Sequence, residues 1–244
     1  QIRIASQIEE ITKQQDQDND GLTAAQEANL GTSDNNKDSD LDGVIDNQDK
    51  HPSGGGSNYK FEINWQHNGQ SYSTQFGIAE DRYYLYRDQP RRPHNKEYAT
   101  YLDPSIQSIA EDITDIARMR NEKCLYCIAI DFVESMIYQY DIDYNGIDDY
   151  PKYAIETIVD KKGDCEDTAY LMAAVLKSLN INTVLLLYSD HMAVGVSCSN
   201  CEGTYYNYNG EKFYFLETTG NPNSWQIGRA WDKYQYESPR IIEI

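Results

Sequence analysis

The stretch Gly163-Asp164-Cys165-Glu166-Asp167 decides the expected fold, because it interrupts the chain and then begins a helix at a cysteine. Apolar residues recur on one helical face after it, at Ala169, Met172, Val175, Leu176 and Leu179. A thiol in the first helical turn lies near free backbone N–H groups and the positive end of the dipole, which lower its pKa. Glu166 and Asp167 oppose this through like charge, so the sequence leaves the net direction open.

Three apolar stretches downstream predict β-strands at residues 183–188, 191–196 and 212–217. His191 opens the second strand and Glu217 closes the third. A thiol, an imidazole and a carboxylate placed in this way can meet at one edge as nucleophile, base and orienting acid. Taken singly, a cysteine beside an apolar helix is more often a small buried residue, and a strand histidine more often a satisfied core residue.

The region before this stretch combines strand and helix patterns. Residues 59–65 and 72–76 alternate around Asn68-Gly69, the strongest signal for a tight hairpin turn. Residues 105–118 carry a helical stripe of Ile106, Ile109, Ile113 and Ile116, and residues 127–140 show a second helical pattern. We therefore expect an α+β fold, with the Cys165 helix packed on an antiparallel sheet.

The whole stretch resembles the transglutaminase-like superfamily of papain-like cysteine enzymes. The matching segments are Tyr150-Pro151-Lys152-Tyr153, Glu156-Thr157, residues 163–167, His191-Met192-Ala193-Val194-Gly195-Val196 and Leu216-Glu217-Thr218-Thr219. The resemblance implies a papain/transglutaminase-like core and a catalytic triad of Cys165, His191 and Glu217. Many members have Asp in the third place, so the Glu here is a departure. The resemblance covers roughly residues 59–244, with its specific motifs between Tyr150 and Gly220.

Composition excludes some classes of partner. The 244 residues carry 40 acidic and 21 basic side chains, a formal net charge of −19, which repels phosphate backbones. Nucleic acid is therefore not an expected partner. Apolar runs are too short for a membrane-spanning helix, and the first residues lack a signal-peptide pattern. Because the chain begins at Gln1, it is compatible with a processed product, and the missing signal decides nothing.

A first aspartate ladder matches the twelve-position EF-hand loop over residues 16–27. Carboxylates stand at positions 1, 3 and 5, a glycine at 6, a backbone carbonyl at 7 and a glutamate at 12. The predicted calcium ligands are Asp16, Asp18, Asp20, Leu22 and Glu27, with a water at position 9. An entering helix is expected from the stripe of Ile4, Ile8 and Ile11.

A second ladder repeats this spacing over residues 38–49 and predicts Asp38, Asp40, Asp42, Val44, Asp46 and Asp49 as ligands. The tandem looks like thrombospondin type 3 or related calcium repeats, and Asp34 or Asn36 is placed to reach a neighbouring ion. The alternative is a merely solvated acidic segment. Two ladders in register with the glycine at the same step favour Ca²⁺, which would order a segment poor in apolar residues.

Residues 53–57 read as a flexible linker. The expected domains are therefore a calcium-binding repeat module at 1–52, a linker at 53–58 and a transglutaminase-like catalytic domain at 59–244.

Four further cysteines form two C-x-x-C pairs, Cys124 with Cys127 and Cys198 with Cys201. Brought together, they supply four ligands at the spacing of a structural Zn²⁺ site. In the extracellular setting that calcium repeats favour, they would instead form disulfides. The spacing leans toward zinc, and in either case we expect the pairs to clamp the helix before Asp131 to the strand of His191. Cys165 is left single, as suits a reactive thiol.

The sequence thus predicts an extracellular or cell-surface enzyme that transfers an acyl group from an amide through a thioester at Cys165. Hydrolysis of a protein or peptide, as by a thiol protease, is favoured because no feature marks an amine site. The alternatives are a cross-linking transglutaminase and a non-catalytic, calcium-dependent scaffold or adhesion module.

Overall fold

The computed structural model describes residues 14–40, 43–53, 58–145, 149–219 and 226–244. The chain divides into two compact units, one comprising Gln1–Tyr59 and Gly77–Asp88 and the other comprising Lys60–Phe76 and Gln89–Ile244. The first unit therefore takes in residues 77–88, which the sequence pattern assigned to the second domain. Among the described residues, we find no helix with the length and apolarity needed to cross a membrane.

The described residues of the first unit have little regular structure. They include the helices α2 (Ala24–Leu30) and α3 (Glu80–Arg87). Thr23 caps α2 by a capping box with Gln26, and Gly31 ends the helix in the left-handed conformation. The described residues before α2 and between α2 and β1 consist mostly of turns, which is compatible with the predicted loops. The predicted helix with Ile4, Ile8 and Ile11 lies outside the described residues, as does Asp42.

A β-hairpin joins β1 (Asn58–His67) to β2 (Gln70–Ala79). Asn68 and Gly69 both adopt positive φ, at 48° and 73°, so the predicted Asn-Gly turn is confirmed. Within the second unit, Trp65 packs edge-on against Phe132 at 5.5 Å. His67 Nδ1 also lies 2.6 Å from the Asp131 carboxylate, so both contacts attach the hairpin to helix α5 (Leu125–Glu134).

The helices of the second unit begin with the short 3₁₀ helix η1 (Lys96–Tyr98), followed by α4 (Pro104–Arg120) and α5 (Leu125–Glu134). Asp103 caps α4, and Pro104 occupies its first turn. The predicted isoleucine stripe of α4 is buried, as expected. The predicted helix over 127–140 is wrong beyond Glu134, because the chain becomes extended at β3 (Ile137–Tyr138) and pairs in parallel with β4 (Lys162–Gly163). Helices α6 (Asp141–Asn145) and α7 (Ala154–Asp160) lie between these two strands in sequence.

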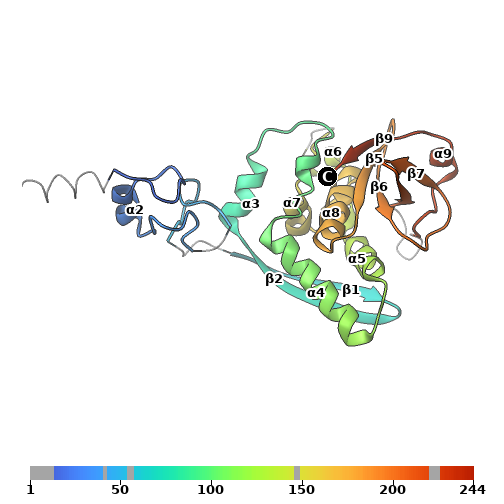
Figure 1. The fold of residues 1–244 in the computed structure, drawn as a ribbon, viewed down its shortest axis with the longest axis horizontal. Coiled ribbons are helices and arrows are strands. Elements are labelled where there is room, and N and C mark those ends of the chain that lie inside the picture. The colour runs from blue at the N-terminus through green and yellow to red at the C-terminus, as the bar shows by residue number, and fades with distance from the viewer. Residues whose placement is uncertain (1–13, 41–42, 54–57, 146–148, 220–225) are drawn as a thin grey trace, which may run out of the picture. The chain divides into compact units, whose positions relative to one another are not determined.

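The five-stranded antiparallel sheet has the order β7-β8-β6-β5-β9 (Figure 1). Its strands are β5 (Thr183–Leu187), β6 (Met192–Ser197), β7 (Tyr205–Tyr208), β8 (Glu211–Leu216) and β9 (Arg240–Glu243). The three predicted strands are therefore confirmed. Since Val194 pairs with Leu216 in antiparallel register, the start of β6 lies beside the end of β8. His191 and Glu217 flank those two ends.

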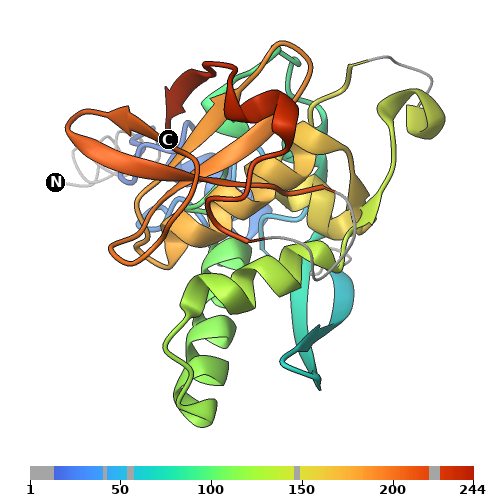
Figure 2. The ribbon, with the colours of Figure 1, turned by 90° about the vertical axis from the view of Figure 1, so that its right-hand side faces the viewer.

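Helix α8 (Cys165–Ser178) packs on strands β5 and β6, and helices α4, α5 and α7 pack against α8 (Figures 1 and 2). Residues 169–176 are wholly buried, as expected of a helix covered on all sides. The sheet also carries a second apolar cluster, formed by Val184, Leu186, Tyr188, Ala193, Phe213, Phe215, Ala230 and Tyr234. Burial on both faces explains why β5 reads as a continuous apolar run. The fold is α+β, with the Cys165 helix packed on an antiparallel sheet.

Candidate active site

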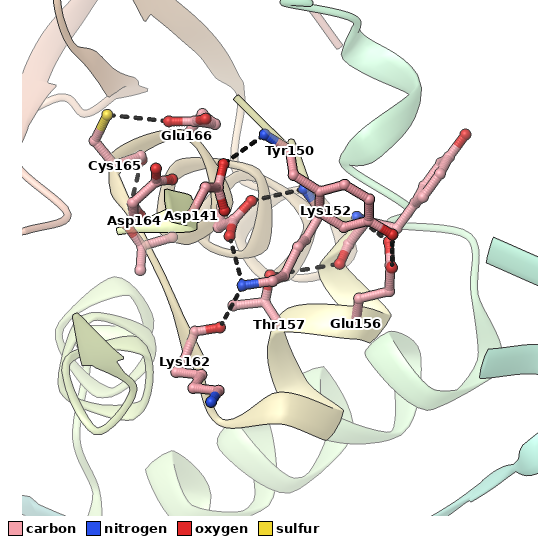
Figure 3. A network of polar contacts seen from close by, with 12 residues as sticks. Asp141, Tyr150, Lys152, Glu156, Thr157, Lys162, Asp164, Cys165 and Glu166 are labelled. Carbon is pink, nitrogen blue, oxygen red and sulfur yellow. Dashed lines mark hydrogen bonds and ion pairs between the residues drawn. The ribbon is translucent and has the colours of Figure 1, made fainter. Parts of the chain in front are cut away.

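Cys165 is the first residue of α8, and its side chain is partly buried. The Asp164 carbonyl accepts the Thr168 N–H at 3.1 Å, which closes the first turn of the helix. The thiol donates a hydrogen bond to Glu166 Oε2 at 3.1 Å (Figure 3). The backbone N–H of Met192, the residue after His191, also faces the sulfur. The thiol therefore lies between an acidic neighbour and the start of β6.

His191 and Glu217 meet at the sheet edge that the strand pattern predicts. Imidazole Nε2 lies 3.1 Å and 3.2 Å from the two Glu217 oxygens, and both side chains are buried. Glu217 Oε1 also accepts the N–H of Thr218 at 2.9 Å, and the N–H and hydroxyl of Thr219 at 3.0 and 2.8 Å. These donors hold the carboxylate in one orientation. Because Nε2 faces Glu217, Nδ1 is the ring nitrogen left for another partner.

The sheet edge that carries Glu217 contacts helix α8 directly. Thr168, one turn after Cys165, donates its hydroxyl to Thr218 at 3.2 Å in a buried contact. Thr168 and Thr218 are 50 positions apart in the chain, so this contact holds the end of β8 against the start of α8. The Met192 N–H beside the sulfur does the same for the start of β6. The structure therefore gathers Cys165, His191 and Glu217 from three separate elements.

The pKa of the Cys165 thiol is raised, first by burial and then by the Glu166 and Asp164 carboxylates. Sequence analysis leaves this direction open and names Asp167 as the second opposing charge. In the structure Asp164 takes that place, because Asp167 points elsewhere. Burial and the Glu166 carboxylate also raise the pKa of Asp164 to about 9.

Asp167 forms a buried ion pair with Lys152. Lys152 Nζ lies 3.1 Å from Asp167 Oδ2, and the Lys152 N–H donates to Oδ1 at 2.7 Å (Figure 3). Lys152 Nζ also donates to the Lys162 carbonyl at 3.3 Å. Burial raises the pKa of Asp167 to about 7. A Cβ on Gly163 would come within 2.4 Å of the Asp167 Cβ, so this position accepts only glycine. The pair thus fixes the segment that leads into Cys165.

A second polar contact orders the matching segment around Tyr150. Glu156 Oε1 lies 2.9 Å from Arg91 Nη2 and accepts the Tyr150 hydroxyl at 3.2 Å, while Glu156 Oε2 accepts the Tyr153 N–H at 2.9 Å. These residues support the start of α7. Tyr150, Tyr153 and Glu156 belong to the segments that carry the resemblance, whereas Arg91 does not, and the contacts of all four residues here are structural.

Two aromatic rings cover His191, and sequence analysis missed both. The imidazole stacks on Tyr234 at 5.0 Å and 17°, and on Trp231 at 5.9 Å and 12°. Trp231 remains half-exposed, whereas Tyr234 is buried. No spacing pattern in residues 224–244 links these rings to a histidine some 40 positions earlier. Their place follows from the return of the chain over the sheet to α9 (Asp232–Gln235).

Each C-x-x-C pair closes on itself. The structure has disulfides Cys124–Cys127 and Cys198–Cys201, and leaves Cys165 free. Of the two alternatives drawn from the sequence, the structure therefore has disulfides, and sulfurs bonded in this way are not available as thiolate ligands to zinc. The expected clamp between α5 and β6 is wrong, because each bridge spans three positions within one segment.

The first calcium ladder gathers unpaired oxygens. Asp16, Asp18 and Asp20 each offer a carboxylate oxygen within 4.8 Å of the others, and Glu27 is 1% exposed. Asp16 Oδ1, Asp18 Oδ2, Asp20 Oδ2 and both Glu27 oxygens are buried without a hydrogen-bond partner among the described residues. Burial and then the carboxyl of Asp34 raise the pKa of Glu27 to about 7. A convergent set of hard oxygen donors of this kind fits Ca²⁺. Leu22 follows the loop glycine, and its N–H donates to Asp20 Oδ1 at 2.6 Å.

The second ladder repeats the local geometry of the first. Gly21 N–H donates to Asp16 Oδ2 at 3.1 Å, and Gly43 N–H donates to Asp38 Oδ2 at 2.9 Å. Both glycines adopt a positive φ, near 100° and 92°, as a turn at loop position 6 demands. Asp46 differs from its expected place, since one of its oxygens lies within 4.8 Å of Asp20 and Glu27. This residue of the second ladder therefore faces the first loop.

No protein-family model matches the chain, and no curated protein matches it. Among solved structures, the chain is similar to one described as the crystal structure of a TGase, with a TM-score of 0.35 and 12% identity over 73% of this chain and 50% of that one. It is also similar to a putative cysteine protease from Cytophaga hutchinsonii, with a TM-score of 0.32 and 15% identity over 71% of this chain and 60% of that one. The chain thus spans about half of the first structure and three-fifths of the second. At these scores the likeness carries no argument about the site, whose interpretation depends on its geometry.

Proposed function

We propose that the second unit is a cysteine-dependent enzyme that cleaves amide bonds by acyl transfer. Cys165 attacks the carbonyl, His191 accepts the thiol proton and later delivers a proton to the leaving amine, and Glu217 holds the imidazole in the required tautomer. The observation that carries this proposal is the buried His191–Glu217 hydrogen bond, at 3.1 Å, beside the only free thiol of the described residues.

The raised pKa of Cys165 favours a particular order of events. A neutral thiol is a weak nucleophile, so His191 must remove its proton as the sulfur attacks, rather than hold a thiolate in advance. The Cys165 N–H, at the first position of α8, has no acceptor within the helix and would donate to the tetrahedral oxyanion. Burial and the nearby Glu166 carboxylate disfavour a thiolate, whereas the thioester carries no charge and does not incur this penalty.

Hydrolysis is the reaction that we favour, with a protein or peptide as the substrate. Transfer of the acyl group to an amine, as in a cross-linking transglutaminase, uses the same thioester and is the second candidate. The raised pKa of the Cys165 thiol also fits a third candidate, in which the unit is a non-catalytic scaffold.

We further propose that the first unit binds Ca²⁺ through the ladder oxygens, chiefly those of Asp16, Asp18, Asp20 and Glu27. The ion would supply the positive charge that these buried carboxylates lack, and would order the loops. Calcium loops and the two disulfides together support an extracellular or cell-surface location. Zinc at the cysteine pairs would require that both disulfides be reduced.

Turnover of a fluorogenic peptide library tests the enzyme proposal. Cys165→Ala should abolish turnover, and Glu217→Gln should lower kcat/KM by on the order of 10²–10⁴. Glu202→Gln, which removes the same charge from an exposed side chain, is the matched control and should leave turnover unchanged. Turnover that survives Cys165→Ala would exclude the thiol mechanism. A wild-type protein that cleaves nothing, with a Cys165 inert to iodoacetamide at every pH, would favour the scaffold.

A further inference from the structure

Three carboxylates form an acidic wall beside the proposed nucleophile. Glu166 accepts the Cys165 thiol, and one of its oxygens lies within 4.8 Å of oxygens from Asp141 and Asp149. Asp149 is exposed, Glu166 is half-buried and Asp141 is buried, so the wall runs from solvent to the interior. Figure 3 shows Asp141, Asp164 and Glu166 gathered on the side of α8 where Cys165 lies.

None of these three carboxylates forms an ion pair with a cation among the described residues, although Lys152 acts on Asp141 at longer range. Asp141 is 2% exposed, and its Oδ2 accepts the Tyr150 N–H at 2.6 Å, but its Oδ1 has no hydrogen-bond partner. Lys152, the buried ammonium nearby, is engaged by Asp167. A buried acceptor without a donor is costly, and a positive group arriving from solvent at Asp149 and Glu166 would offset that cost.

Two exposed aromatic side chains, Tyr138 and Tyr140, lie near the segment that leads into Cys165. Tyr138 pairs in register with Gly163, two residues before Cys165, and the Gln139 N–H donates to the Gly163 carbonyl at 3.0 Å. Tyr138 and Tyr140 are 41% and 59% exposed, and their rings meet edge to face at 5.2 Å. Exposed ring faces next to carboxylates favour ammonium and guanidinium groups through cation–π attraction.

We propose that the acyl-donor peptide carries a basic side chain, Lys or Arg, next to the reacting carbonyl, and that Glu166, Asp149, Tyr138 and Tyr140 receive it. This inference depends on the proposed function and names the substrate class. The geometry favours the acyl donor, rather than the acceptor amine, as the source of this positive charge. The reason is that Glu166 accepts a hydrogen bond from the Cys165 thiol before any reaction has begun. A cation that pairs with Glu166 frees the thiol and weakens the charge that opposes its ionisation before the attack, whereas an acceptor amine arrives only after the thioester exists.

Methanethiosulfonate reagents measure the charge preference at the thiol without any turnover. The Cys165 thiolate attacks the sulfenyl sulfur of the reagent, a disulfide forms and methanesulfinate leaves, while the thiol proton passes to the buffer. The trimethylammonium-ethyl reagent should react on the order of tenfold faster than the sulfonato-ethyl reagent at low ionic strength, with the neutral methyl reagent between them. Salt should reduce this ratio. Equal rates, or a faster anionic reagent, would overturn the proposal.

Variants separate this charge preference from thiol acidity. Glu166→Gln should raise the rates of all three reagents, because it removes a charge that disfavours the thiolate, yet lower the cation-to-anion ratio about threefold. Asp149→Asn should lower the ratio without a comparable gain in rate. Asp115→Asn, on the exposed face of α4, removes the same charge and should leave the ratio unchanged. Tyr138→Leu should slow the cationic reagent about two- to fivefold, whereas Tyr138→Phe keeps the ring and should not. If Asp115→Asn changes the cation-to-anion ratio as much as Glu166→Gln does, the ratio reports only the overall charge of the chain. That result would overturn the proposal.

Matched peptides identify the source of the positive charge. Donor peptides with Lys or Arg next to the scissile bond should be cleaved at least tenfold faster than those with norleucine or citrulline, and Glu166→Gln should narrow the gap. If only the charge of an added amine acceptor alters the rate, the assignment to the donor is wrong. A third outcome is that no peptide is cleaved, yet the cationic reagent still reacts faster than the anionic one and this difference depends on Glu166. In that case the proposed function fails, but the preference for cations at the thiol remains.

Discussion

Replacing Lys152 by Met should destabilise the second unit in a pH-dependent way. Lys152 and Asp167 are both 0% exposed, with Nζ and Oδ2 3.1 Å apart. Coulomb's law gives about 5 kcal/mol at that separation for an effective dielectric of 20. The pKa of Asp167 is already raised to about 7. Without the ammonium of Lys152, this pKa should rise further, by about 2 or more. The variant will therefore bury a protonated Asp167 where the wild type buries an ion pair.

The sign follows from proton linkage. In the wild type the folded pKa of Asp167 exceeds its unfolded value of 3.8, so this carboxyl lowers stability as the pH rises to about 7 and adds no further loss above it. In Lys152→Met the loss continues above pH 7, at about 1.4 kcal/mol per pH unit. Below pH 7 the free energy of unfolding of the variant should be about 2 kcal/mol lower than that of the wild type. This loss comes from the altered packing and from the missing hydrogen bond between Lys152 Nζ and the Lys162 carbonyl. By pH 9 the difference should reach roughly 4–5 kcal/mol.

Urea unfolding followed by tryptophan fluorescence measures this difference. All three tryptophans of the chain belong to the second unit, so the signal follows that unit. Lys123→Met, at an exposed lysine, is the control and should cost under about 0.5 kcal/mol at either pH. A loss for Lys152→Met that is the same at pH 6 and pH 9 would refute the reasoning, since Asp167 would then not depend on Lys152 for its charge.

Three further outcomes are expected. In the unreduced protein, Ellman's reagent should detect one of the five cysteines, Cys165. Detection of five thiols, together with a zinc signal in X-ray fluorescence, would contradict the two disulfides. The rate of Cys165 alkylation by iodoacetamide should keep rising above pH 9, because the thiol pKa is raised; a plateau already reached at neutral pH would show a preformed thiolate. Chelation of calcium should make the first unit sensitive to proteases while the tryptophan-monitored unfolding midpoint stays in place, and Glu27→Gln should weaken calcium binding by an order of magnitude or more in calorimetry. Equal protease sensitivity with and without chelator would count against a metal-ordered unit.

Features that leave a local pattern could be predicted from the sequence. The helix at Cys165, the isoleucine stripe of α4, the Asn68-Gly69 turn and the strands next to His191 and Glu217 each follow from periodicity or turn chemistry within a few residues. Because β6 and β8 are antiparallel neighbours, His191 and Glu217 lie at one edge of the sheet, so the strand pattern predicts that they pair.

Features that depend on distant segments could not be predicted. The sequence indicates Asp167 as a like charge that opposes thiolate formation, but its partner, Lys152, comes from 15 residues earlier. Trp231 and Tyr234 reach His191 only because the chain returns over the sheet. The end of α5 at Glu134 is decided by strand pairing with Gly163, which competes with a helical pattern that continues in the sequence.

Each disulfide encloses so little chain that it contributes only about half of what a long-range bridge would contribute. A ring of four residues restricts the unfolded chain by about 2 kcal/mol, whereas a bridge from Cys127 to Cys198, closing a loop of about 70 residues, would contribute about 4 kcal/mol. The architecture around Cys165 thus depends on the buried helix and its apolar neighbours. Mild reductants of the kind used to keep a thiol enzyme active should leave this unit folded.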